Sequence, residues 1–174
     1  MTSDVPSGNA AVRDEAHLAR ERAEQQFVVG ADALDAGDPS AALGHFTPAL
    51  SSSDEAIAGR AALGAAEALL RLGRDEEAIE LLHRAASASD RALRFQSMRR
   101  LATALVNSGD LEAALEVYRG AERLAPDAAI RSHIATRIGW LTQEIGGSER
   151  SARAAFARSR GGDGAAWVVR AMLI

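Results

Sequence analysis

Apolar residues recur at helical spacing along most of the chain, and short polar or glycine-containing segments interrupt them. The clearest stretch runs from Leu101 to Pro126, where two amphipathic segments flank the tetrapeptide Asn-Ser-Gly-Asp. We expect Gly109 to take the left-handed conformation that ends the first helix. Asp110 can then cap the second helix by accepting its free backbone N–H groups. The pattern therefore predicts a helix-turn-helix unit over this stretch.

The same reasoning predicts helices along nearly the whole chain. The expected ranges are 12–36, 40–50, 55–72, 75–86, 91–108, 111–124, 128–145 and a final repeat helix that ends before Gly161. Pro48 lies inside the second range, and we expect a bend or an early end there because proline cannot donate the helical hydrogen bond. Residues 1–11 are rich in small and polar types, which predicts a disordered N-terminal tail. The apolar segment 163–174 predicts a short capping helix.

The helix-turn-helix unit repeats at a fixed interval. Three turn glycines lie 36 residues apart, and each is followed by an alanine, a large apolar residue and a second alanine at constant spacing. In chain order the positions are Gly37, Ala42, Phe46 and Ala49, then Gly73, Ala78, Leu82 and Ala85, then Gly109, Ala114, Tyr118 and Ala121. A fourth copy, with Gly146, Ala152 and Phe156, is slightly out of phase. We predict about four copies, over residues 12–53, 54–89, 90–126 and 127–162.

The composition supports an all-α protein and narrows its partners. Hydrophobic residues make up 47% of the chain but aromatic residues only 4%, so the core is expected to consist of small aliphatic side chains, among which alanine favours helices most. All 20 basic residues are arginine, which indicates the coding preference of a GC-rich genome and leads us to expect a bacterial source. The formal net charge of −4 disfavours a nucleic-acid partner.

These landmarks resemble the tetratricopeptide repeat, a helix-turn-helix unit of about 34 residues that stacks on its neighbours. The resemblance implies an all-α, right-handed superhelical solenoid of about four repeats over residues 12–162, closed by the capping helix at 163–174. In this family the first helix of each pair lines a concave groove that binds a peptide or helix. The resemblance therefore implies a non-enzymatic adaptor for a protein or peptide partner.

The groove positions of the family fall on polar and aromatic residues here. Carried onto this sequence, the candidate groove residues are Phe27, Arg60, Glu67, Arg71, Arg99, Thr103, Asn107 and Trp140. The arginines would suit an acidic or carboxylate-bearing partner, and the two aromatic residues would supply apolar contact. The clamp of a basic residue and asparagines that holds a chaperone peptide in some members is absent, because Phe27, Ala31 and Glu67 occupy its places.

An alternative remains for each arginine of this set. It can pair with neighbouring acidic residues on a solvated surface, where one such pair is worth only about 0–1 kcal/mol. A second alternative concerns the whole chain, because the apolar residues 165–174 would also suit a homodimer interface.

The sequence offers no pattern for catalysis or for metal or cofactor binding. It contains no cysteine, and its four histidines lie in separate predicted helices without metal-ligand spacing. We expect no catalytic residue, no metal and no cofactor. Neither a secretory signal nor an apolar run long enough for a membrane is apparent, so we expect a cytoplasmic protein without a membrane partner.

Overall fold

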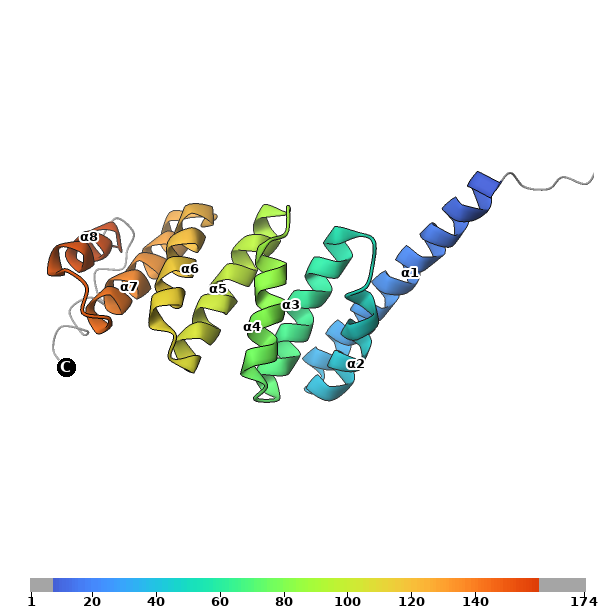
Figure 1. Ribbon diagram of the computed structural model, residues 1–174, viewed down its shortest axis with the longest axis horizontal. Helices are drawn as coiled ribbons and strands as arrows, with labels where there is room; N and C mark the ends of the chain where they lie inside the picture. The colour runs from blue at the N-terminus through green and yellow to red at the C-terminus, as the bar shows by residue number, and fades with distance from the viewer. Residues whose placement is uncertain (1–7, 160–174) are drawn as a thin grey trace, which may run out of the picture. The chain divides into compact units, whose positions relative to one another are not determined.

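The computed structural model describes residues 8–159 and is helical almost throughout (Figure 1). Residues 8–159 form no β-strand. The elements are α1 (Gly8–Asp35), α2 (Pro39–Ala49), α3 (Glu55–Arg71), α4 (Asp75–Ala86), α5 (Arg91–Ser108), α6 (Leu111–Leu124), α7 (Ala128–Glu144) and α8 (Glu149–Ser159). The predicted all-α fold is therefore confirmed for this part of the chain.

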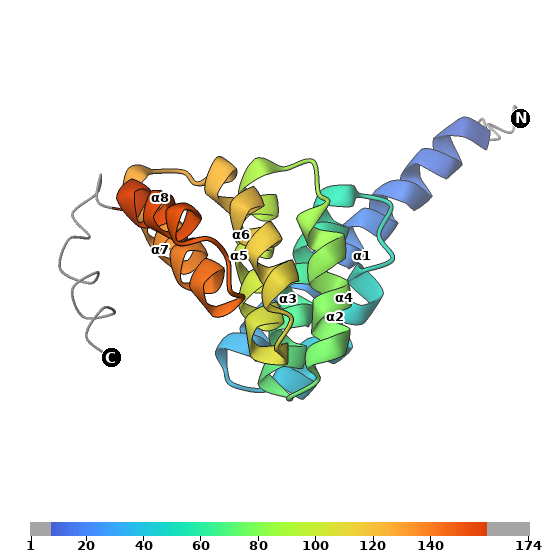
Figure 2. The same cartoon turned by 60° about the vertical axis from the view of Figure 1, so that its left-hand side comes forward.

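The helices pack in consecutive pairs, and the chain divides into two compact units between Ala88 and Ser89. In the first unit, α1 pairs with α2 and α3 pairs with α4, while α3 also packs against both helices of the preceding pair. In the second unit, α5 pairs with α6 and α7 with α8, and α6 packs against α7. Figure 2 brings α7 and α8 forward, where they run beside each other. Each unit thus contains two stacked helix pairs.

Local signals in the sequence fix the helix ends. Gly37, Gly73, Gly109 and Gly146 have φ angles of 82°, 72°, 88° and 70°, and each lies in the turn inside one helix pair. This left-handed conformation is costly for any residue with a Cβ atom, so glycine ends the first helix of every pair. Aspartates cap five helices by accepting a backbone N–H bond: Asp38, Asp54, Asp90, Asp110 and Asp127. The predicted roles of Gly109 and Asp110 are confirmed.

Two helix boundaries add detail to the prediction. Helix α1 begins at Gly8, four residues before the expected start, in a segment where Ala10 and Ala11 favour helix. Helix α2 ends at Ala49, one residue after Pro48, as expected from the missing N–H group. The expected capping helix at 163–174, its dimer segment 165–174 and most of the expected tail lie outside the described residues and stay predictions.

The repeated landmark residues form the core of each unit. The alanines that follow the turn glycines are buried at 0% exposure in all four pairs, at Ala42, Ala78, Ala114 and Ala152. The large residue four positions further on is also buried in every pair, at Phe46, Leu82, Tyr118 and Phe156. Alanine at the closest approach of two helices lets their backbones come together, and the large residue fills the space left between them. The sequence repeat is therefore a packing repeat.

Glycine faces two of the three buried phenylalanines, Phe46 and Phe156. A Cβ atom built on Gly30 of α1 would lie 2.9 Å from the ring of Phe46, and one on Gly64 of α3 would lie 2.5 Å from it. In the second unit, a Cβ atom on Gly139 of α7 would lie 2.7 Å from the ring of Phe156. These distances are well below a normal carbon–carbon contact, so the rings occupy the volume that a methyl group would need.

Candidate interaction surfaces

The eight predicted groove residues divide between the two units. Phe27 lies on α1, and Arg60, Glu67 and Arg71 lie on α3, all in the first unit. The other four lie in the second unit, where α5 carries Arg99, Thr103 and Asn107 and α7 carries Trp140. Each set belongs to the first helices of its pairs, as the family resemblance predicts.

In the first unit, Arg60 is held by its own chain. Its Nη2 atom donates to Oε2 of Glu24 at 2.5 Å, and its guanidinium carbon lies 4.6 Å from the ring centroid of Phe27. The Phe27 ring in turn packs against Phe46, with ring centroids 5.8 Å apart. Arg60 thus joins α3 to α1 through an ion pair and a cation–π contact, both partly exposed.

Arg71 is engaged in the same way. Its Nη1 atom donates to the backbone carbonyl of Leu34 at 2.8 Å, near the C-terminus of α1, where the helix dipole favours a cation. Its Nε atom lies 3.4 Å from Oε1 of Glu67 on the preceding turn of α3. The alternative of intrachain pairing, which the sequence left open, therefore holds for Arg60 and Arg71.

Replacing Arg71 by methionine is expected to lower the free energy of unfolding by about 1 kcal/mol. The change keeps an unbranched apolar stem but removes the charged group that donates to the carbonyl of Leu34. The loss of stability is small because Arg71 is partly exposed to water. Urea denaturation followed by far-ultraviolet circular dichroism measures the effect. The control is Arg74→Met, because the exposed pair of Arg74 with Glu77 connects only adjacent turns and should leave stability unchanged. Equal losses in both variants would contradict a tethering role for Arg71.

In the second unit, Arg99, Asn107 and Trp140 are exposed and available to a partner, whereas Thr103 is partly committed. Thr103 donates from its hydroxyl to the carbonyl of Arg99 at 3.1 Å and lies 3.2 Å from the hydroxyl of Tyr118, so it links α5 to α6. The Arg99 side chain is exposed and forms no ion pair within residues 8–159. Trp140 is 38% exposed, which is unusual for the largest apolar side chain.

The two units differ strongly in charge. Residues 8–88 contain seven arginines and fourteen acidic residues, a difference of −7, whereas residues 89–159 contain eleven arginines and eight acidic residues, a difference of +3. Within the second unit, α5 and α7 contain few acidic residues. Helix α5 has four arginines and no acidic residue, and α7 has two arginines with Glu144 as its one acid. Sequence reasoning missed this segregation, because the net charge of the whole chain conceals it.

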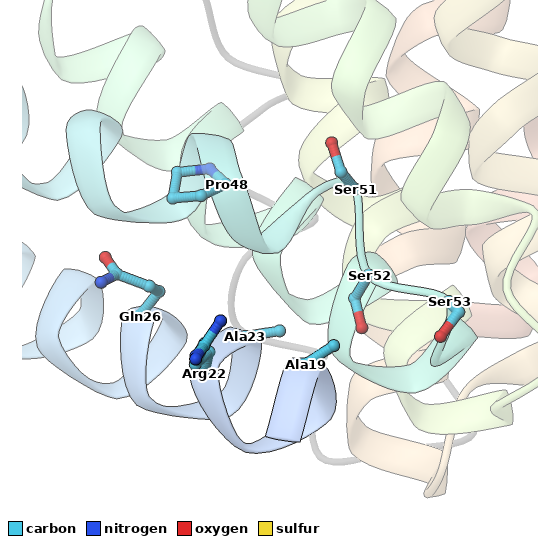
Figure 3. A pocket seen from close by; sticks show the side chains of 8 residues that line it. All are labelled: Ala19, Arg22, Ala23, Gln26, Pro48, Ser51, Ser52 and Ser53. Carbon is cyan, nitrogen blue, oxygen red and sulfur yellow. The ribbon is translucent and has the colours of Figure 1, made fainter. Parts of the chain in front are cut away.

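A pocket of about 360 Å³ lies in the first unit (Figure 3). It opens between the middle of α1 and the connection from α2 to α3, and its lining residues are Ala19, Arg22, Ala23, Gln26, Pro48, Ser51, Ser52 and Ser53. Ser52 accepts the backbone N–H of Asp54 at 3.2 Å, and Asp54 caps α3 and pairs with Arg20 at 2.9 Å. The lining residues of this pocket include no histidine and no carboxylate.

Residues 8–159 contain neither a metal-binding cluster nor a membrane-spanning helix. Among residues 8–159, no cluster of three or more histidine or acidic side chains is placed to hold a metal ion. None of the helices in the same range combines the length and apolar character that a bilayer span requires.

Comparisons with known proteins agree with the fold. A crystal structure of MamA protein aligns with a TM-score of 0.67 and 17% identity, over 82% of this chain and 74% of that one. A second crystal structure of MamA aligns with a TM-score of 0.68 and 16% identity, over 92% of this chain and 95% of that one. At this identity the likeness concerns the fold alone. The comparison with curated protein sequences gave no match.

The sequence model of the tetratricopeptide repeat family matches residues 33–100. This range includes the second helix pair and parts of its neighbours. Repeats of this family are typically non-enzymatic scaffolds for protein interaction, and the match supports that general class. The family resemblance inferred from the turn glycines is therefore confirmed over residues 33–100, which include Gly37 and Gly73.

Proposed function

We propose that this chain is a protein-interaction adaptor that holds a peptide or helix of a partner protein against the first helices of its repeats. The observation that carries the proposal is the exposed pair of side-chain types on the second unit, Trp140 on α7 and Arg99 on α5. Tryptophan and arginine most often dominate the binding free energy at protein interfaces. The proposal centres on the second unit because the arginines of the first unit, Arg60 and Arg71, already form hydrogen bonds with their own chain.

A pull-down from a cell lysate with the full chain and two variants tests the proposal. Arg99→Glu and Trp140→Ala are each expected to reduce the recovery of a specific partner about tenfold or more, since truncating a dominant interface residue costs roughly 2 kcal/mol. Both variants should keep the wild-type circular dichroism spectrum. Arg99→Glu should also keep the unfolding midpoint because its side chain is exposed, whereas Trp140→Ala should lower it, since Trp140 is only 38% exposed and loses its buried contacts. Arg13→Glu on exposed α1 serves as the matched charge control. Partners that bind all four proteins equally would remove the proposal.

A further inference from the structure

We infer that the partner segment is acidic and binds the exposed residues of α5 and α7, with its carboxylates at Arg99 and Arg137 and an apolar side chain on Trp140. This inference rests on the proposed function and adds the chemistry of the partner. We call the exposed residues concerned the A-helix stripes. They are Gln96, Arg99, Thr103 and Asn107 on α5, and His133, Arg137 and Trp140 on α7.

The charge of the A-helix stripes has a single sign. Arg99 and Arg137 are exposed, and neither forms an ion pair with any residue between 8 and 159. The stripes contain no acidic residue, and the nearest ones in sequence are Asp110, which caps α6, and Glu144 in the last turn of α7. A guanidinium without an intrachain ion pair can attract an incoming carboxylate and form two parallel hydrogen bonds with it. Like-charged partners would be repelled, so the surface selects for acidic segments.

Helix α6, the second helix of its pair, differs from α5 because it carries charges of both signs. Helix α6 carries three glutamates and two arginines, and three of these five residues form ion pairs within the unit. Arg119 pairs with Glu116 on α6, and Arg158 of α8 donates to Glu122 at 2.8 Å. The first unit behaves likewise, because Glu24 and Glu67 neutralise the arginines on α3. A partner carboxylate would therefore have to displace an intrachain acid at Arg60 or Arg71, but not at Arg99 or Arg137.

The same charges favour a protein segment over a nucleic acid. Duplex DNA carries one negative charge per about 1.7 Å, and its binding proteins typically neutralise roughly 6–10 phosphates. The A-helix stripes offer two permanent cations, and residues 8–88 of the same chain carry an excess of seven acidic residues. A short acidic peptide needs only a few charge contacts, which the two arginines of the stripes can supply.

Trp140 leads us to expect an apolar residue in the partner segment besides its acidic residues. At 38% exposure the indole ring retains a wide apolar surface in water. Surface salt bridges alone are worth too little for stable binding, since each contributes roughly 0.2–1 kcal/mol. Burial of an aromatic ring supplies the larger, non-directional contribution to the binding free energy. The arginines select a negatively charged partner and raise the association rate.

Selection from a displayed library of random 16-residue peptides against the immobilised full chain tests the inference. The expected enriched peptides combine several Asp or Glu residues with at least one large apolar residue. Their affinity for soluble protein, measured by fluorescence anisotropy of the labelled peptide, should fall about tenfold or more in the double variant Arg99→Glu/Arg137→Glu. It should also fall as the salt concentration rises. The matched control is Arg13→Glu/Arg22→Glu, which makes the same change in net charge on exposed residues of α1.

The outcomes separate the inference from the proposed function. Enriched peptides that are neutral or basic but lose affinity in Trp140→Ala would overturn the acidic partner and keep the interaction surface. Enrichment of no peptide, or equal affinity for all variants, would remove both. A labelled DNA duplex is measured in parallel, and tighter binding of the duplex than of the peptides, lost in the Arg99→Glu/Arg137→Glu variant, would overturn the inference in favour of a nucleic acid.

Discussion

Replacing Phe46 by alanine is expected to lower the free energy of unfolding by about 3–5 kcal/mol. The side chain is 1% exposed, lies between Gly30 and Gly64 and packs against the ring of Phe27. Glycine has no side chain that could move into the space left by the ring, so the cavity cannot close without a shift of the helix backbones. An average domain is stable by only about 5–15 kcal/mol, so this single change removes a large share of that margin.

Urea denaturation followed by circular dichroism measures the loss of stability. Circular dichroism is preferred to tryptophan fluorescence because both tryptophans of the chain lie after residue 88 and do not report on the first unit. Val12→Ala is the control, since Val12 is 64% exposed and its truncation removes few contacts. Tryptophan fluorescence should report a smaller shift than circular dichroism if the two units unfold separately. A Phe46→Ala loss of less than about 1 kcal/mol would show that the helices collapse around the missing ring and that the fit to the glycines is loose.

Gly64→Ala carries the second-largest expected effect, a loss of about 1–3 kcal/mol despite the better helix propensity of alanine. The added methyl group would lie 2.5 Å from the Phe46 ring, which is itself 1% exposed and also lies close to Gly30 of α1. Gly44→Ala is the matched control, because a Cβ atom there meets no atom within 4 Å. This control is expected to raise stability by up to about 1 kcal/mol.

A double-mutant cycle assigns the Gly64→Ala effect to the ring. Phe46→Leu in the Gly64→Ala background should cost less than Phe46→Leu alone, because the smaller side chain vacates the space that the new methyl group needs. The expected coupling is about 1 kcal/mol or more, measured by the same urea experiment. Additive losses would mean that the methyl group is accommodated by a movement of α3 rather than opposed by Phe46.

The helix ends could be predicted from the sequence because the interactions that fix them are local. The ranges expected for α4, α5 and α6 match the structure, since a left-handed glycine such as Gly109 and a capping aspartate such as Asp110 act within a few residues. The phase of the repeat also placed the core, because one position in each helix pair faces the neighbouring helices. These signals need no knowledge of how distant segments meet.

The state of each candidate arginine could not be predicted in the same way. Arg60 and Glu24 are 36 residues apart and meet only because α3 stacks on α1. The bond from Arg71 to the carbonyl of Leu34 has no sequence signal at all, because every residue has a carbonyl. The groove positions of the family therefore identified the surfaces. The contacts of each side chain in the structure then showed which arginines form no intrachain ion pair and can bind a partner.

The pairing of phenylalanine with glycine limits how this chain could be rebuilt from its own parts. Gly30 faces Phe46 and Gly139 faces Phe156, while the corresponding positions of the two central copies are Ala66 and Ala102, with Leu82 and Tyr118 in their second helices. A second helix moved from the first copy to the second would replace Leu82 by a phenylalanine beside Ala66, whereas the aromatic ring that the third copy combines with alanine, Tyr118, also forms a hydroxyl contact to Thr103 that phenylalanine lacks. The copies are thus not interchangeable modules, and duplication or shuffling of one pair would require a matching change in its neighbours.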